Sequence, residues 1–286
     1  MQPDEMLSRV VNIAGEAGDI IMPFFQNGCS HDLKADRSPV TEADFASHRY
    51  LVNKLEELTP TLRVVSEESA GFEAIAKSAT EDYWLVDPLD GTKGFLKGKP
   101  EFTVNVALMR HHRPILGVVH APAIKLTYFA LNGQGAWRQE GRTTTTPIRT
   151  RPADLTRLTV VASKDHSGVR VKRLLERLSS PSLTSIGSAL KFCLVADGRA
   201  DLYFRDLPTM EWDTAAAQCV VEAAGGRVLD LSGETFGYGK AGLKNSGFVT
   251  VGDPGFRWRD LAAGAENQDA FRAFFAEICT EADGRS

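Results

Sequence analysis

The apolar positions in the first part of the chain recur at helical spacing. Over residues 4–26 they fall three or four residues apart, at Met6, Val10, Ile13, Ala17, Ile20 and Phe24. This period predicts an amphipathic helix. A turn-rich stretch follows at 27–40, and Thr41-Glu42-Ala43-Asp44 then resembles a capping box that opens a second helix. Residues 63–69, RVVSEES, predict a short strand that ends in acidic residues.

The middle of the chain has the pattern of a sheet. Four β-rich runs lie close together: YWLVDP, FTVNVALM, ILGVVHAP and LTYFAL. Turn signals such as Asp90-Gly91 and Ala121-Pro122 separate them. The spacing predicts an antiparallel meander rather than βαβ units. Gly133-Gln134-Gly135 and the Thr143–Thr146 run are expected to mark its end.

From about residue 153 predicted strands and helices alternate. Strands are expected at 158–163, 201–204, 227–231 and 247–252, and helices at 168–179, 187–195 and 212–224. Gly225-Gly226 is a typical helix stop, and the residues after 255 predict a charged amphipathic helix. The order indicates an α+β domain at 1–152 and an α/β domain at 153–286, packed as layers.

Composition narrows the class of protein. The 286 residues are 43% hydrophobic and 24% charged, which is typical of a globular protein and excludes a disordered or collagen-like chain. The net charge of −4 gives no sign of the positively charged surface that binding a nucleic-acid polymer requires. The sequence has no secretory signal and no run long enough to span a membrane. Cys193 and Cys219 lie in apolar helical patterns and are expected to be buried thiols. We therefore expect a cytoplasmic protein.

Acidic residues stand at the boundaries of four predicted elements: Asp44, Glu67-Glu68, Asp87 with Asp90, and Asp213. Each has an ordinary interpretation, because Asp-Pro and Asp-Gly favour turns, an aspartate can cap a helix, and a glutamate pair is usually solvated.

Together these residues indicate more than turns and caps. Asp87 and Asp90 bring two carboxylates and the Leu89 carbonyl into one tight turn, and such hard oxygen ligands suit Mg²⁺. The amides of Gly91 and Thr92 could meet a phosphate oxygen where a helix begins. The Thr92 hydroxyl beside these carboxylates could orient and deprotonate a water molecule.

Four motifs carry a resemblance to a known family: VTEAD at 40–44, SEES at 66–69, WLVDPLDGTKGF at 84–95 and EWDTAAAQCVVEAAGG at 211–226. Over residues 5–254 the chain resembles the inositol monophosphatase superfamily of Mg²⁺-dependent, lithium-sensitive phosphatases. The resemblance implies a layered αβαβα sandwich with two or three Mg²⁺ ions per site. It also implies Glu67, Asp87, Asp90, Asp213 and the Leu89 carbonyl as ligands. Thr92, hydrogen-bonded to Asp44, would take the proton of the attacking water.

Within the superfamily the chain is most similar to the 3'(2'),5'-bisphosphate nucleotidases of bacterial sulfur assimilation. Lys93-Gly94-Phe95 follows the threonine, and Ser188, Lys191, Arg205 and His166 stand in matching places. The resemblance implies removal of the 3'-phosphate of adenosine 3',5'-bisphosphate, or of its sulfated form PAPS. It further implies that Gly91, Thr92, Asp213 and those four residues bind the substrate. Ser188 and Lys191 are expected on one helix face.

Several alternatives stay open. An inositol-1-monophosphatase or a fructose-1,6-bisphosphatase would share the metal chemistry. A binding protein that has lost catalysis would lack the water activator, whereas Thr92 and Asp44 are both present. A Ca²⁺ module is disfavoured because no Asp-x-Asp-x-Asp-Gly loop occurs. Ala217 and Gly94 depart from common family residues. The resemblance allows a monomer or homodimer and a peripheral association with the inner membrane.

Overall fold

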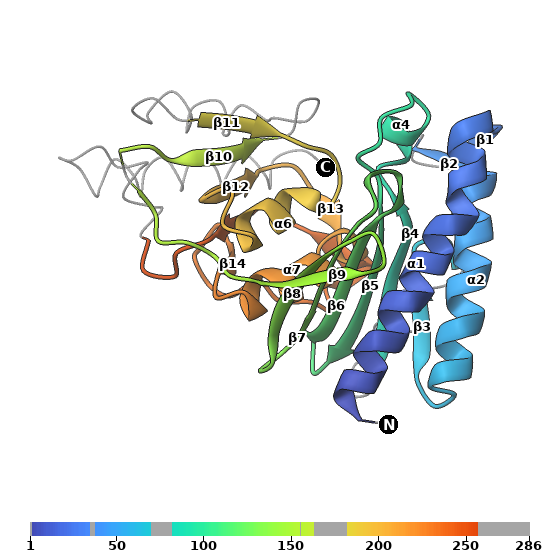
Figure 1. Ribbon diagram of the computed structural model, residues 1–286, viewed down its shortest axis with the longest axis horizontal. Coiled ribbons are helices and arrows are strands. Elements are labelled where there is room, and N and C mark those ends of the chain that lie inside the picture. The colour runs from blue at the N-terminus through green and yellow to red at the C-terminus, as the bar shows by residue number, and fades with distance from the viewer. Residues whose placement is uncertain (1, 35–37, 70–81, 155, 163–181, 257–286) are drawn as a thin grey trace.

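The computed structural model describes residues 2–34, 38–69, 82–154, 156–162 and 182–256. Figure 1 shows two long helices against one face of a large sheet, two shorter helices behind it, and a second sheet beyond them. This order confirms the predicted layered sandwich for the four layers that the described residues form. His166, the helix predicted at 168–179 and most of the predicted C-terminal helix lie outside the described residues.

The two predicted N-terminal helices are confirmed as α1 (Pro3–Asn27) and α2 (Glu42–Leu58). α1 begins with proline in its first turn, where the missing amide hydrogen costs no hydrogen bond. α2 begins with the predicted capping box, because the Thr41 hydroxyl accepts from the Asp44 amide and the Asp44 carboxylate accepts from the Thr41 amide. The turn-rich stretch before α2 contains a short hairpin of β1 (His31–Leu33) and β2 (Pro39–Thr41).

The first sheet has seven strands in the order β3-β4-β5-β6-β7-β8-β9. Their bounds are β3 Arg63–Ser66, β4 Tyr83–Asp90, β5 Thr103–Arg110, β6 Arg113–Ala121, β7 Leu126–Leu131, β8 Gly135–Glu140 and β9 Thr144–Ile148. β3 runs parallel to β4, and the other neighbours are antiparallel, so the meander is confirmed.

The predicted end of this meander at 133–146 is wrong. Gly133, with φ of 81°, lies in the turn between β7 and β8, and the threonine run forms most of β9. Threonine is β-branched and favours a strand, so the run that suggested a loop extends the sheet instead.

The second sheet has the order β11-β10-β12-β16-β14. Its strands are β10 Thr159–Ala162, β11 Ser182–Ser185, β12 Leu202–Arg205, β14 Arg227–Asp230 and β16 Phe248–Val251. A further two-stranded ladder joins β13 (Thr209–Met210) to β15 (Lys244–Asn245). Short helices complete the described chain: α4 Thr92–Phe95, η1 Pro122–Ile124, η2 Glu211–Asp213 and η3 Ala241–Leu243.

Two of the later helices differ from their predicted bounds. The helix expected at 187–195 is α6 (Leu190–Ala196), which starts late because Ser188 adopts a left-handed φ of 54°. The helix expected at 212–224 is divided into η2 and α7 (Ala215–Ala223), with Thr214 between them in a non-helical conformation. The predicted stop is confirmed, since Gly225 follows with φ of 103°.

The core has three parts. One lies between α1, α2 and the first sheet, and a second lies between the other face of that sheet, the helices α6 and α7, and the second sheet. A smaller cluster includes Leu202 and Val249 of the second sheet. Cys193 and Cys219 are buried free thiols, as predicted. The second of these parts, which lies between the two sheets, contains residues from both halves of the chain. The domain boundary at residue 152 stays a prediction.

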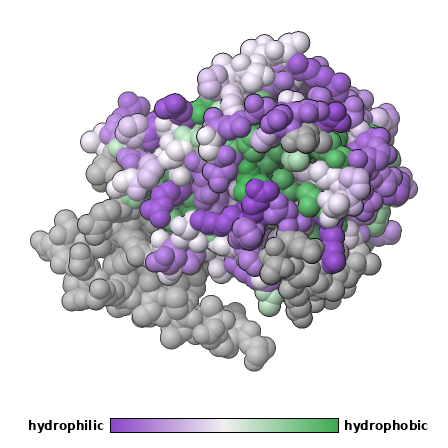
Figure 2. Space-filling view, turned by 90° about the horizontal axis from the view of Figure 1, so that it is seen from below, coloured by the Kyte–Doolittle hydropathy of each residue, from purple (hydrophilic) through white to green (hydrophobic). Residues whose placement is uncertain are grey.

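The face of the molecule seen in Figure 2 is mainly polar. Seen from below, the molecule shows hydrophilic residues over most of its face, with hydrophobic residues in a patch near the middle (Figure 2). Among the described residues, no helix combines the length and hydrophobicity that crossing a bilayer requires.

Candidate active site

A cavity of about 350 Å³ opens where the turn after β4, the start of α6 and the helix η2 meet. It brings together residues that are distant in sequence. Ten of the predicted site residues line it: Glu67, Asp87, Leu89, Asp90, Gly91, Thr92, Ser188, Lys191, Arg205 and Asp213. Asp44 lies behind Thr92, to which it is hydrogen-bonded. The structure thus places the acidic residues around one space, and their roles stay predictions.

The end of β4 and the turn that follows it are held from three sides. The Asp87 carboxylate accepts a hydrogen bond from the Leu89 amide at 3.0 Å, and the register of β4 against β5 shifts between Asp87 and Asp90. Ser47 of α2 donates to the Pro88 carbonyl at 2.9 Å. Gly91 has φ of 96°, and a Cβ atom there would lie 2.3 Å from the Ser188 Oγ. Only glycine therefore permits the turn to approach α6 this closely.

Three aspartates crowd around the cavity. Asp87 is buried, whereas Asp90 and Asp213 keep part of their surface open. Burial raises the pKa of the Asp87 carboxyl well above its ordinary value, and Glu67, Asp90 and Asp213 raise it further by repulsion. Burial likewise raises the pKa of Asp213, with Asp90 and Glu67 adding to the effect. A positive charge among these groups would relieve the repulsion.

The donor set fits a hard divalent cation, although no three His, Cys, Asp or Glu side chains of the described chain are already arranged to hold one. Four carboxylates and the Leu89 carbonyl offer only oxygen ligands, which Mg²⁺ prefers. Asn105 supplies a further sign, because its Oδ1 is buried without a hydrogen-bond partner while its Nδ2 lies 3.5 Å from Asp90. Glu67, Asp87, Asp90, Asp213 and Leu89 would therefore hold the ion.

The Thr92 hydroxyl connects the cavity to α2. It donates to Asp44 Oδ1 at 3.2 Å and to the Leu89 carbonyl at 3.1 Å. The other Asp44 oxygen accepts from the amide and the hydroxyl of Thr41, so one carboxylate both caps α2 and contacts Thr92. Burial raises the pKa of Asp44 against the effect of these hydrogen bonds. Asp44 is consequently better suited to receive a proton than an exposed aspartate.

Two cations also line the cavity. Lys191 is only 6% exposed, and its ammonium donates to the Ser188 carbonyl at 2.8 Å. Burial lowers the pKa of Lys191 to about 8, although Asp90 opposes this change. Arg205, at the end of β12, also lines the cavity. These two cations can bind an anionic group.

The prediction that Ser188 and Lys191 share a helix face is wrong. Ser188 lies before the first residue of α6, and its left-handed conformation turns the hydroxyl to the Asp90 carbonyl, to which it donates at 2.8 Å. Ser188 therefore links α6 to the turn after β4. It still lines the cavity, and its contact with a substrate stays a prediction.

Three polar residues beside the site were not predicted. Lys34 donates to Glu67 at 2.7 Å and to Glu68 at 2.6 Å, and these carboxylates raise its pKa even though burial lowers it. Asn105 and Ser47 hold the turn that carries the aspartates. Asn105 had a visible signal, because it is the polar residue inside the apolar run FTVNVALM. The residues around Ser47 and Lys34 in the sequence show no pattern that would have indicated their contacts with the site.

The fold and this cavity define a family. The chain belongs to the inositol monophosphatase family, whose model matches residues 2–265. Among curated relatives, the 3'(2'),5'-bisphosphate nucleotidase CysQ of Escherichia coli K12 is 45% identical over 256 residues, which cover 88% of this chain and 98% of the relative. CysQ of Haemophilus influenzae is 34% identical, covering 90% and 97% of the two chains.

Solved structures agree with this assignment. The crystal structure of CysQ from Bacteroides thetaiotaomicron superposes with a TM-score of 0.76 at 34% identity and covers 87% of this chain and 97% of that one. An inositol monophosphatase of Thermotoga maritima superposes with a TM-score of 0.74 at 25% identity, covering 96% and 99%. These neighbours confirm the predicted fold class and the predicted family.

Proposed function

We propose that this protein is a Mg²⁺-dependent phosphatase that hydrolyses the 3'-phosphate of adenosine 3',5'-bisphosphate to give AMP and phosphate. One observation carries the proposal: a single cavity is lined by four carboxylates, next to the Thr92–Asp44 pair, and by the two cations Lys191 and Arg205. A substrate with two phosphates fits such a site, because the carboxylates can hold a metal ion for one phosphate while the cations bind the other. The name of the CysQ relatives, 3'(2'),5'-bisphosphate nucleotidase, supports the same substrate class.

Beside the carboxylates, the chain's own residues would prepare a water molecule for attack. Mg²⁺, when bound, would supply positive charge that activates water and stabilises the leaving oxygen. Thr92 Oγ1 would accept the water proton while its own hydrogen passes along the existing hydrogen bond to Asp44 Oδ1. The water oxygen would bond to phosphorus, the bond from phosphorus to the 3'-oxygen would break, and the nucleoside would keep that oxygen. The 3'-oxygen would then take a proton from solvent water, and Asp44 would return its proton to solvent.

Lys191 and Arg205 would hold the 5'-phosphate, which does not react. The Lys191 side chain is fixed by its hydrogen bond to Ser188 and by the Tyr203 ring, whose centroid lies 5.7 Å from Nζ. A fixed charge can use the binding energy of the second phosphate to orient the first. We further propose two or three Mg²⁺ ions per site, lithium sensitivity, a cytoplasmic location, and a monomer or homodimer.

Initial rates of phosphate release across four substrates test the proposal. The set contains adenosine 3',5'-bisphosphate, its sulfated form, inositol 1-phosphate and fructose 1,6-bisphosphate, each with and without Mg²⁺ and Li⁺. We expect the highest kcat/KM for a bisphosphate nucleotide, dependence on Mg²⁺ and inhibition by Li⁺. A higher kcat/KM for inositol 1-phosphate would contradict the substrate and assign the protein to the inositol phosphatases.

A further inference from the structure

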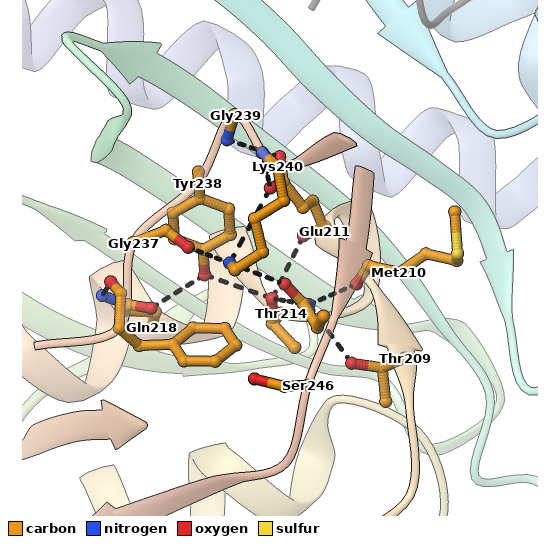
Figure 3. A network of polar contacts seen from close by, with 12 residues as sticks. Thr209, Met210, Glu211, Thr214, Gln218, Gly237, Tyr238, Gly239, Lys240 and Ser246 are labelled. Atoms are coloured by element: carbon orange, nitrogen blue, oxygen red, sulfur yellow. Dashed lines mark hydrogen bonds and ion pairs between the residues drawn. The ribbon is translucent and has the colours of Figure 1, made fainter. Parts of the chain in front are cut away.

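A network of polar groups surrounds the helix η2, which carries Asp213 (Figure 3). Its members come from β13, η2, Thr214, α7, the segment before β15 and β15 itself: Thr209, Met210, Glu211, Thr214, Gln218, Tyr238, Lys240 and Asn245. Glu211 is fully buried, and Asn245 is 1% exposed. None of these groups moves a proton or holds a phosphate in the proposed reaction, so their arrangement calls for another explanation.

We propose that Asn245, oriented by Lys240, is a positioning residue that fixes the carboxylate of Asp213 and thereby sets the affinity of the site for a divalent cation. The inference rests on the proposed function in one respect, which is that Asp213 is a cation ligand. It concerns how a ligand is held rather than which groups bind the ion.

The connection to Asp213 runs through Met210. One oxygen of Asp213 accepts a hydrogen bond from the Met210 amide at 2.8 Å. The Asn245 side-chain amide donates to the carbonyl of the same residue, also at 2.8 Å, and to the Thr214 hydroxyl at 3.1 Å. Asn245 therefore contacts the chain on both sides of Asp213. One oxygen of Asp213 is thus held by Met210, and the residue lines the cavity.

The orientation of the Asn245 amide is fixed by its partners. The Lys240 ammonium, which can only donate, lies 3.1 Å from Asn245 Oδ1. The Met210 carbonyl, which can only accept, lies against Nδ2. A flipped amide would set donor against donor at Lys240 and acceptor against acceptor at Met210. Lys240 thus determines which end of the Asn245 amide meets the segment that carries Asp213.

Lys240 is itself held in place. Glu211 accepts from the amides of Gly239 at 3.0 Å and Lys240 at 2.8 Å, and its carboxylate lies 3.8 Å from the Lys240 ammonium. The ammonium also lies 4.3 Å from the centroid of the Phe236 ring. Figure 3 shows Lys240 reaching from its loop toward Glu211 and the centre of the network. The carboxylate and the ring leave the ammonium little freedom.

The loop that carries Lys240 packs closely against the first sheet. Gly239 has φ of 81°, and a Cβ atom there would lie 2.1 Å from the His112 Nδ1. Only glycine fits this contact with the turn between β5 and β6. The residue before Lys240 is therefore packed against the turn that joins two strands of the first sheet.

Direct binding of Mn²⁺ to the full-length, chelator-treated protein tests the inference. The free ion is titrated by electron paramagnetic resonance, which requires no turnover. Loss of a residue that orients a metal ligand typically weakens binding by about 10- to 100-fold. We expect a loss of this size for Asn245→Ala. Lys240→Met should also weaken binding, and the double variant should be no weaker than Asn245→Ala, since Lys240 acts through Asn245.

The matched control is Tyr128→Phe. Tyr128 is buried, and its hydroxyl donates one hydrogen bond to Asp197 at 3.0 Å, away from the cavity. The control should lose thermal stability and keep the Mn²⁺ affinity of the wild type within twofold. If Asn245→Ala does not fold, Lys240→Met decides the question, because it leaves the Asn245 amide in place.

The outcomes separate this inference from the proposed function. A loss of fivefold or more for Asn245→Ala, together with an unchanged control, supports the inference. A smaller loss, or an equal loss in the Tyr128→Phe control, overturns it while the metal-dependent function stands. A wild-type protein that does not bind Mn²⁺ contradicts the proposed metal site, and the inference falls with it.

Discussion

Replacement of Lys191 by methionine tests whether the cations of the cavity recognise a second phosphate. Lys191 is 6% exposed, and methionine keeps most of its buried stem but removes the ammonium that donates to the Ser188 carbonyl. A hydrogen bond to a charged group contributes about 1.5–3 kcal/mol, which corresponds to a factor of about 10 to 150 in kcat/KM. We expect Lys191→Met to reduce kcat/KM for adenosine 3',5'-bisphosphate by that factor.

The control is a substrate rather than a second variant. Adenosine 3'-phosphate has the scissile group but no 5'-phosphate, so the variant should change its kcat/KM by less than about threefold, well below the loss expected for a charged contact. The ratio of the two values also cancels any indirect effect of the lost charge on Asp90. Equal losses for both substrates would refute the reasoning and remove Lys191 from the second phosphate subsite.

The pH profile gives an independent check on Lys191. Since kcat/KM reports the free enzyme, the preference of the wild type for the bisphosphate should decline as the pH rises through about 8, where Lys191 loses its charge. The Lys191→Met variant should show no such decline. A preference that stays constant from pH 7 to 9.5 would contradict the assignment.

Two further predictions concern catalysis and stability. Thr92→Val removes the hydroxyl that donates to Asp44 and should lower kcat by about 100-fold or more with little change in KM or melting temperature, whereas a kcat within threefold of the wild type would exclude Thr92 as the proton acceptor. His120, whose pKa burial lowers from 6.5 to about 4, is favoured in its neutral form by the fold. The wild type should therefore lose about 2.5 kcal/mol more stability than His120→Gln between pH 7 and pH 4.5 in urea unfolding, and equal losses would contradict the reasoning.

Local sequence patterns predicted the elements whose partners are near in the chain. The 3.6-residue period of α1, the capping box at Thr41 and the stop at Gly225 each depend on contacts within a few residues. The same holds for the turn from Asp87 to Asp90, in which Asp87 accepts from Leu89 two residues away. Since these interactions are local, their residue types and spacing were sufficient to predict them.

Other features depend on contacts between distant segments, which spacing does not encode. Ser188 leaves the expected helix because its hydroxyl meets Asp90, 98 residues earlier. The threonines of β9 form a strand because β8 provides a partner for their backbone. Asn245 contacts Met210 across 35 residues, and a lone asparagine near a strand gives no local signal of that role. The predicted motifs therefore identified residues that line the cavity, but not the residues that hold these in place through contacts with distant segments.

The central claim is that Glu67, Asp87, Asp90 and Asp213 form a cation site that hydrolyses a bisphosphate nucleotide. The most direct measurement is phosphate release from adenosine 3',5'-bisphosphate at saturating substrate, before and after chelation and again after Mg²⁺ is restored, for the wild type and Asp87→Asn. The account predicts that chelation abolishes release, that Mg²⁺ restores it in the wild type, and that Asp87→Asn recovers about 1% or less, since metal ligation by this carboxylate is lost. Release that persists without Mg²⁺, or full recovery in Asp87→Asn, would contradict it.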